Sequence, residues 1–140
     1  AVGGSVTITT LPGYLPISSS ESMLELYVKN AASLVGKESL NKLSHRTGST
    51  DMGDISQLMP VIHPYVEAAS GQGHGIDYLV QDYELGVLTG SKAMAMTVVD
   101  LLSDGGRKGK SISDGYKPPL TKAEYLALLR GMMREDTYTE

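Results

Sequence analysis

The first residues of the chain alternate between apolar and polar side chains. Within residues 2–10, Val6 and Ile8 alternate with serine and threonine, which predicts a half-buried β-strand. Residues 11–16 then read Leu-Pro-Gly-Tyr-Leu-Pro, a turn-rich sequence that ends the strand and predicts a rigid connector. The chain therefore opens with a strand and a sharp change of direction.

Three longer segments carry apolar residues at spacings of three and four, the period of an amphipathic helix. Each has a polar N-cap, and the first two are also followed by a glycine at which a helix can end. The first predicted helix begins at Ser18 (with Glu21) and ends at Gly36, and the second begins at Asp82 and ends at Gly105. The third begins at Thr121 (with Glu124).

Shorter patterns fill the intervals between these helices. Residues 39–45 and the apolar run 61–63, which lies between two prolines, predict strands, and residues 55–59 predict one helical turn. Residues 48–55 and 68–76 are rich in glycine and polar residues, so both predict loops. Strands that alternate with helices predict the α/β fold class.

Composition narrows the class of protein. A chain of 140 residues with 41% hydrophobic content can bury one domain's core. A net charge of −4 gives no electrostatic argument for nucleic acid or an anionic membrane surface. No unbroken apolar run reaches the length of about 20 residues that crosses a bilayer, and no signal peptide is recognisable. With no cysteine, the composition indicates a cytoplasmic protein whose metal ligands are restricted to His, Asp and Glu.

The first glycine-containing loop places two carboxylates, Asp51 and Asp54, beside Ser49 and Thr50. We interpret Asp54 as the N-cap of a short helix, because such side chains accept hydrogen bonds from free backbone N–H groups. For Asp51, helix capping and an active-site role stay open alternatives.

The second loop carries His74 between two glycines. An imidazole in such a loop can serve as a metal ligand or a general base, but its spacing from other residues matches no zinc motif. His63 follows two β-branched residues and precedes a proline, which favours a partly buried, hydrogen-bonded side chain. The residues alone therefore do not identify a function.

Four motifs follow one another in an informative order. They are V-T-I-T-T-L-P-G-Y-L-P-I, G-S-T-D-M-G-D, P-V-I-H-P-Y and G-H-G, at residues 6–17, 48–54, 60–65 and 73–75. In this order they resemble the C-terminal part of the two-zinc peptidases and amidohydrolases that include aminoacylases and carboxypeptidases. The resemblance is strongest to amidohydrolases similar to aminobenzoyl-glutamate hydrolase, and it runs from about Val2 to about Tyr125.

The resemblance implies a catalytic α/β domain in three layers, a sheet with helices on both faces, and an inserted ferredoxin-like lid domain that mediates dimerisation. Residues 1–16 would be the last strand and return hinge of the lid, and residues 17–140 the C-terminal portion of the catalytic domain. Two zinc ions, with manganese or cobalt as alternatives, would be bound in the full enzyme. His74 matches a metal ligand, and Asp77 stands where the family usually has glutamate.

The same resemblance assigns Ser49, Thr50 and Asp51 to the active-site loop and His63 to the edge of the pocket. The general-base glutamate and the other ligands are expected upstream, so no catalytic residue is assigned in this segment. We expect a C-terminal fragment of a cytoplasmic zinc-dependent metallopeptidase or amidohydrolase that acts on small N-acyl amino acids or dipeptide-like substrates. The full-length protein would be a homodimer without nucleic-acid or membrane partners.

By itself the fragment is expected to be inactive and to hold little or no zinc. An unpaired sheet edge and apolar helix faces are expected to make it self-associate or pair with an N-terminal piece. The alternative hypothesis is a non-catalytic α/β interaction module that retains only the tail of the fold.

Overall fold

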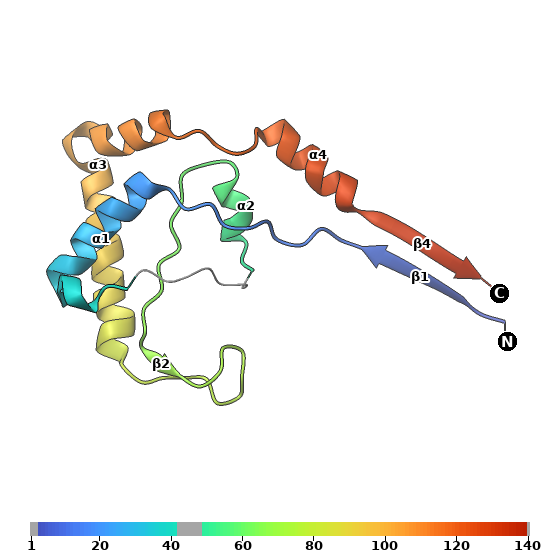
Figure 1. Ribbon diagram of the computed structural model, residues 1–140, viewed down its shortest axis with the longest axis horizontal. Coiled ribbons are helices and arrows are strands. Elements are labelled where there is room, and N and C mark those ends of the chain that lie inside the picture. The colour runs from blue at the N-terminus through green and yellow to red at the C-terminus, as the bar shows by residue number, and fades with distance from the viewer. Residues whose placement is uncertain (1–2, 42–48, 140) are drawn as a thin grey trace. The chain divides into compact units, whose positions relative to one another are not determined.

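The computed structural model describes residues 3–41 and 49–139 of the chain (Figure 1). Their contacts form two compact units. Unit 1 comprises Ala1–Ser18, Gly48–Met59 and Lys117–Glu140, and unit 2 comprises Ser19–Thr47 and Pro60–Tyr116. Each unit is therefore assembled from separate stretches of sequence. The division into a lid part and a catalytic part at residue 16 stays a prediction.

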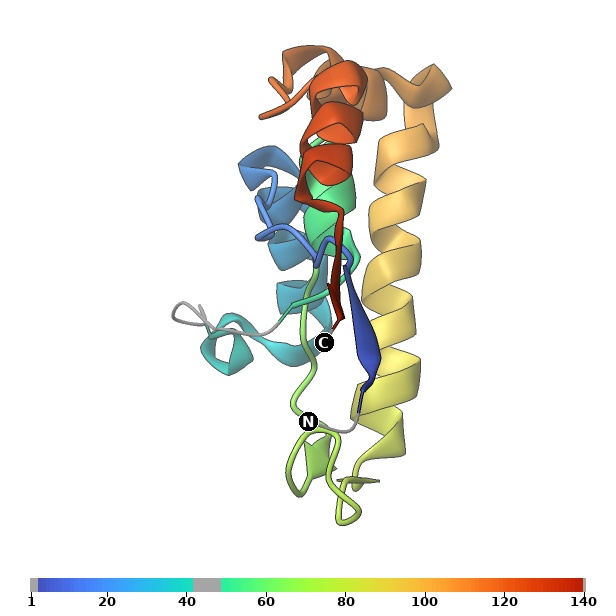
Figure 2. The ribbon, with the colours of Figure 1, turned by 90° about the vertical axis from the view of Figure 1, so that its right-hand side faces the viewer.

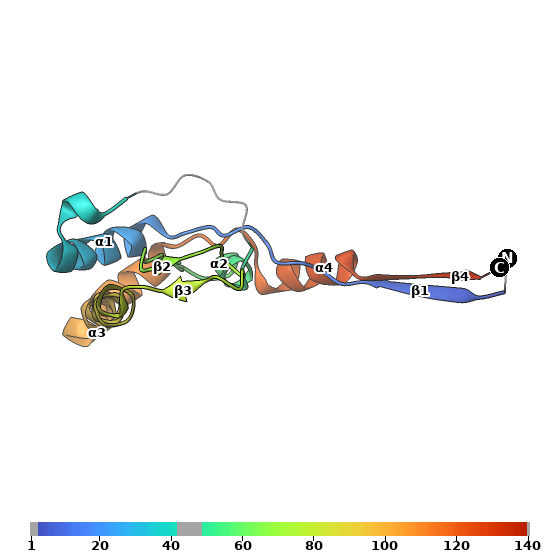
Figure 3. The ribbon, with the colours of Figure 1, turned by 90° about the horizontal axis from the view of Figure 1, so that it is seen from below.

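Unit 1 contains an antiparallel ribbon of two strands, β1 (Ser5–Thr10) and β4 (Arg134–Thr139). Figures 1 and 3 show the strands side by side, with Val6 opposite Tyr138 in the register. The prediction of a strand at residues 2–10 is confirmed, but the prediction that it is half-buried is wrong. Val6 and Ile8 are 54% and 49% exposed, because a two-stranded ribbon has no further layer against which to bury an apolar face.

The same unit contains helix α4 (Lys122–Met132), whose predicted capping box is confirmed. The Thr121 hydroxyl accepts a hydrogen bond from the Glu124 amide at 3.2 Å, and the Glu124 carboxylate accepts one from the Thr121 amide at 2.7 Å. The Thr121 hydroxyl also lies 2.7 Å from the same carboxylate oxygen. These bonds satisfy N–H groups that the first turn of a helix leaves free.

We expect the first turn of α4 to lose stability in acid. Hydrogen bonds from the backbone and side chain of Thr121 lower the pKa of the Glu124 carboxyl. The stability that these bonds give the helix is complete when the pH is above the pKa that Glu124 has in the unfolded chain. It is lost as the pH falls through the lower pKa that Glu124 has in the folded helix. Carboxyl ¹³C NMR should show that Thr121→Ala raises the pKa of Glu124. The Glu124→Gln variant keeps a hydrogen-bonding side chain and should remove the pH dependence. An unchanged pKa in Thr121→Ala would contradict this account.

Unit 2 is built on two packed helices, α1 (Glu21–Val35) and α3 (Gly90–Gly115). Tyr27 and Ala31 of α1 meet Ala93 of α3 in a small buried core, against which Leu40 and Ile62 also pack. Helix α1 ends at Gly36, as predicted, with a positive φ of 82° that glycine adopts readily. It begins differently from the prediction.

The N-cap of α1 is Ser20, not Ser18. The Ser20 side chain accepts a hydrogen bond from the Met23 amide, and the helix starts at Glu21. The Ser20 amide itself donates to the Val61 carbonyl at 2.8 Å, which ties the start of α1 to the segment around residue 61. The capping-box prediction for Ser18 and Glu21 is therefore wrong by two residues.

A polar cluster lies within the contact between α1 and α3. The Asn30 side chain, 6% exposed, donates to the Asp100 carboxylate at 2.9 Å and to the Thr97 hydroxyl at 3.3 Å. Thr97 in turn donates to the Ala93 carbonyl one helical turn earlier at 2.8 Å. Because Asn30 and Thr97 are buried and their hydrogen bonds are directional, they fix the register of one helix on the other.

Helix α3 follows a π-helical segment, η2 (Glu84–Thr89), and the predicted N-cap Asp82 is confirmed by its bond to the Leu85 amide at 2.8 Å. The predicted end near Gly105 is only partly right. The backbone leaves helical geometry at residues 103–106 and then resumes a helix that runs to Gly115. Figure 2 shows the long straight part of α3 and the turn that follows it.

By length and composition alone, the helical stretch Glu84–Gly115 is a candidate membrane span, because an 18-residue window within it has a mean hydropathy of 1.4. The stretch is not a continuous apolar run, because Lys92 and Asp100 interrupt it. The core helix of a water-soluble protein also meets the criterion. The stretch therefore does not decide whether the chain meets a membrane.

The shorter predicted elements differ most from the structure. Residues 61–63 are irregular rather than a strand, and Ser39 ends a short 3₁₀ helix, η1 (Lys37–Ser39), where a strand was predicted. Residues 42–45 of that predicted strand lie outside the described residues. A helical segment does occur near the predicted turn at 55–59, as α2 (Met52–Ser56).

The remaining strands, β2 (Ala69–Ser70) and β3 (Leu79–Val80), form a small antiparallel pair. In the part of the chain that the structure describes, helices and strands are thus mixed, as an α/β prediction requires. The sheets there are two antiparallel pairs, β1–β4 and β2–β3. The three-layer catalytic domain implied by the family resemblance is not confirmed.

Candidate functional site

The S-T-D-M-G-D motif lies at the start of α2, in unit 1. Asp51 occupies the N-cap position, but its side chain caps no backbone amide and instead accepts a hydrogen bond from the Thr50 hydroxyl at 3.1 Å. The Asp51 side chain is exposed, so the carboxylate is available to a ligand. Ser49, which precedes this pair, is also exposed. Of the two alternatives left open for Asp51, side-chain capping is thereby excluded.

Asp54 has a different role from the one predicted. It lies inside α2, and its carboxylate accepts a hydrogen bond from the Leu15 amide at 3.1 Å. The prediction that Asp54 caps a short helix is therefore wrong. Its carboxylate instead binds the connector that follows β1, through this hydrogen bond.

Two further residues of this region hold the connector against α2, and no sequence pattern indicated them. Ser56, which has no exposed surface, accepts from the Ser18 amide at 2.9 Å and donates to the Gly53 carbonyl at 2.6 Å. The Gln57 side chain donates to the Pro16 carbonyl at 2.7 Å. The available sequence signal for Ser56 and Gln57 was that they are polar and follow the motif. Polar residues at such positions are also typical of the ordinary exposed face of a helix.

His74 lies in the loop that joins β2 to β3, in unit 2. The loop is closed by bonds from the Gly75 amide to the Gln72 carbonyl at 2.7 Å and from the Tyr78 amide to the Gly75 carbonyl at 3.2 Å. His74 is exposed and has a φ of 65°, a left-handed conformation that few residues other than glycine adopt. Such local strain is found often at functional positions.

Asp77 stabilises this loop through its side chain. Its carboxylate accepts a hydrogen bond from the Gln72 amide at 3.4 Å, across the turn that contains His74. A Cβ at Gly75 would overlap this carboxylate and would also lie 2.9 Å from the backbone carbonyl oxygen of Gln72, so close packing favours glycine at the second glycine of G-H-G. The loop thus presents the His74 imidazole on a backbone with several internal bonds.

His63 lies in the irregular segment before β2 and is partly buried, as predicted. Its ring packs against that of Tyr65, with centroids 5.0 Å apart and a tilt of 52°. This tilted arrangement is a favourable geometry for two aromatic rings. His63 thus has a packing role, whereas its predicted position at the edge of an active-site pocket stays a prediction.

The predicted site residues are divided between the units. Ser49, Thr50 and Asp51 belong to unit 1, whereas His63 and His74 belong to unit 2. Within residues 3–41 and 49–139, no three His, Asp or Glu side chains come together as potential metal ligands. A pair of zinc ions needs several nitrogen and oxygen ligands, so the donor set of these residues does not by itself fit such a pair.

Comparison with known proteins gives one informative similarity, which is to a peptidase. Over 97 residues, 64% of its length, the chain is 31% identical to Xaa-Arg dipeptidase from Homo sapiens. The chain spans only 22% of the length of that dipeptidase. No protein-family model matches the chain, and no solved structure matches it.

Proposed function

We propose that the chain forms part of a hydrolase that cleaves the amide bond of dipeptide-like or N-acyl amino acid substrates. The 31% identity to a dipeptidase carries this proposal. The order of the four sequence motifs supports it independently, because it resembles metal-dependent peptidases and amidohydrolases. Since the chain spans 22% of the dipeptidase, the activity belongs to a complete site of which these residues supply a part.

Within such a site, His74 would be a metal ligand. Its exposure and the hydrogen-bonded loop beneath it support this role, because a ligand must be accessible and held in place. The bound metal would be zinc, with manganese or cobalt as alternatives, and it would supply a Lewis acid for amide hydrolysis. The other ligands and a general-base glutamate would come from residues outside this sequence.

Asp51, with Ser49 and Thr50, would form a loop at the edge of the active site. The Thr50 hydroxyl holds one oxygen of the Asp51 carboxylate, and the exposed side chain can accept hydrogen bonds from a substrate amide or ammonium group. Asp54, Ser56 and Gln57 hold α2, which follows this loop, against the connector. The complete protein would be a cytoplasmic homodimer.

The test of this function uses the natural gene product that contains this sequence. We expect it to hydrolyse Xaa-Arg dipeptides or N-acyl amino acids when loaded with zinc. Removing a group that only supports a metal ligand lowers activity or metal affinity roughly 10–100-fold. Removing the ligand itself should cost more, so His74→Ala should lower kcat/KM by more than about 100-fold and reduce the zinc content. The 140-residue chain assayed by itself gives an inactive baseline.

Gln72→Ala is the matched control, because Gln72 lies in the same exposed loop and contributes its backbone to the turn. It should retain activity and metal. If the gene product hydrolyses none of these substrates, or if His74→Ala keeps both activity and zinc, the proposed function is wrong. An inactive gene product would favour the non-catalytic interaction module.

A further inference from the structure

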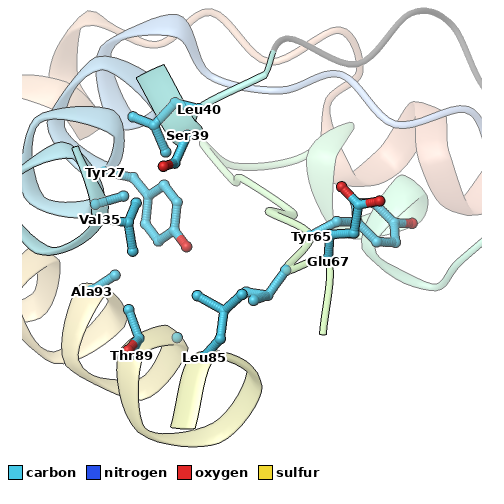
Figure 4. A pocket seen from close by; sticks show the side chains of 12 residues that line it. Tyr27, Val35, Ser39, Leu40, Tyr65, Glu67, Leu85, Thr89 and Ala93 are labelled. Carbon is cyan, nitrogen blue, oxygen red and sulfur yellow. The ribbon is translucent and has the colours of Figure 1, made fainter. Parts of the chain in front are cut away.

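Unit 2 contains a cavity of about 310 Å³ that is separate from the loop of His74 (Figure 4). It lies between α1, the end of η1, η2, the start of α3 and the irregular segment before β2. Most of its wall is apolar, formed by Ala31, Val35, Leu40, Val66, Leu85 and Ala93. Its volume is at the lower end of the range of about 300–1,000 Å³ found for small-molecule sites.

The polar side chains that line the cavity are those of Tyr27, Ser39, Tyr65, Glu67 and Thr89. Figure 4 shows the hydroxyl of Tyr27 directed into the cavity, although the residue as a whole is only 8% exposed. Within the described ranges of the chain, no side chain or backbone group forms a hydrogen bond with that hydroxyl. Among the described residues no fully buried side-chain oxygen or nitrogen lacks a partner, so solvent reaches this hydroxyl in the empty cavity. A ligand that fills the cavity displaces that solvent and must itself supply an acceptor, because a donor left without one is costly in an apolar site.

The charge around the cavity restricts the kind of ligand. Among its lining residues the one ionisable carboxyl is that of Glu67, and none is a lysine, arginine or histidine. Figure 4 shows the Glu67 carboxylate beside Tyr65, on the far side from the Tyr27 hydroxyl. Burial raises the pKa of Tyr27, which keeps the phenol protonated as a donor at neutral pH. The cavity lining therefore offers no positively charged side chain to pair with an anionic ligand.

We propose that this cavity binds a small, uncharged, largely apolar molecule with one carbonyl oxygen, which accepts a hydrogen bond from Tyr27. The site is distinct from the proposed hydrolase site. A dipeptide carries charged ends, whereas the wall of this cavity offers mainly methyl and methylene groups. The ligand class is that of small ketones and esters.

Matched probes test the proposal on the 140-residue chain. Acetophenone has the carbonyl oxygen, α-methylstyrene has the same shape with a methylene in its place, and benzoate is anionic. Methyl NMR signals of Ala31, Val35 and Ala93 report binding inside the cavity. Acetophenone and α-methylstyrene should shift these signals in a saturable way, and benzoate should leave them unchanged.

Tyr27→Phe keeps the ring and removes the hydroxyl. It should weaken acetophenone by about fivefold, the equivalent of one hydrogen bond, and leave the Kd of α-methylstyrene unchanged. Thr89→Phe places a ring in the cavity and should abolish binding of both. Val98→Phe is the bulk control, because Val98 is exposed on α3 and does not line the cavity.

Three results would each overturn the proposal. One is a Tyr27→Phe variant in which acetophenone binds as tightly as before. Another is binding that survives in Thr89→Phe, which would place the probes elsewhere. The third is benzoate that shifts the same methyl signals as strongly as acetophenone does. Circular dichroism of each variant confirms that the helices of unit 2 are retained in the comparison.

Discussion

Gly53→Ala is expected to detach the connector from α2 and to destabilise unit 1 by about 2–4 kcal/mol. Gly53 is buried, and a Cβ at this position would overlap the carbonyl oxygen of Leu15, a backbone atom that cannot rotate away. Hydrogen bonds of Asp54, Ser56 and Gln57 hold the connector against the helix, so the whole network must shift. Urea unfolding and hydrogen exchange of the Leu15 and Ser18 amides measure the effect.

The sign of this effect makes the test sharp. Alanine favours a helix over glycine by about 1 kcal/mol, so helix propensity alone predicts that Gly53→Ala stabilises α2. Gly13→Ala is the matched control, because a Cβ at Gly13 would have no atom within 4 Å. If Gly53→Ala is as stable as Gly13→Ala, the close approach between the connector and α2 is wrong.

Asn30→Asp is the second substitution with a large expected effect, about 2–4 kcal/mol at neutral pH. The change keeps the shape of the side chain but replaces its donor with a second carboxylate next to that of Asp100, which the Asn30 amide contacts at 2.9 Å. Two adjacent carboxylates raise the pKa of one of them in the folded state. The penalty is therefore present above that raised pKa and is relieved as pH falls through it.

The exchanged pair Asn30→Asp with Asp100→Asn supplies the control for this prediction. It restores one donor and one carboxylate in the contact between α1 and α3, and it should recover most of the lost stability. Thermal unfolding between neutral and acidic pH measures all three proteins. If the stability of Asn30→Asp relative to the wild type does not change with pH, the contact between Asn30 and Asp100 is wrong.

Local rules predicted the helix ends that depend on neighbouring residues. The capping box of Thr121 and Glu124, the N-cap Asp82 and the stop at Gly36 each involve groups within a few positions. The start of α1 was mispredicted because residues 18–20 are three serines and any of them can cap a helix. The choice depends on distant partners: Ser18 donates its amide to Ser56, and Ser20 donates its amide to Val61.

Elements that rest on distant pairing were not predictable in this way. β4 has the sequence Arg-Glu-Asp-Thr-Tyr-Thr, with little apolar periodicity, and it is a strand because β1 supplies its hydrogen bonds. Its threonines and tyrosine, which favour strands, were the available signal. The apolar run 61–63 gave the opposite error, since a run of three cannot distinguish a strand from a buried irregular segment.

The candidate site shows the same contrast between features that the sequence predicts and features that depend on distant partners. Residue type and motif order selected Asp51 and His74, and the structure finds both exposed in loops. The left-handed backbone of His74 and the connector bonds of Asp54 and Ser56 carried no sequence signal, because each depends on a specific conformation or a distant partner. Such supporting contacts are identified by structure.

The pairing of β1 with β4 also has a consequence for how the chain folds. The hydroxyls of Thr7 and Thr137 meet at 3.0 Å although 130 positions separate them in the sequence. The entropy of closing such a loop must be overcome before the ribbon returns any stabilisation, and a two-stranded ribbon returns little. The local helices α1 and α3 need no such closure, so we expect β1 and β4 to pair after those helices have formed.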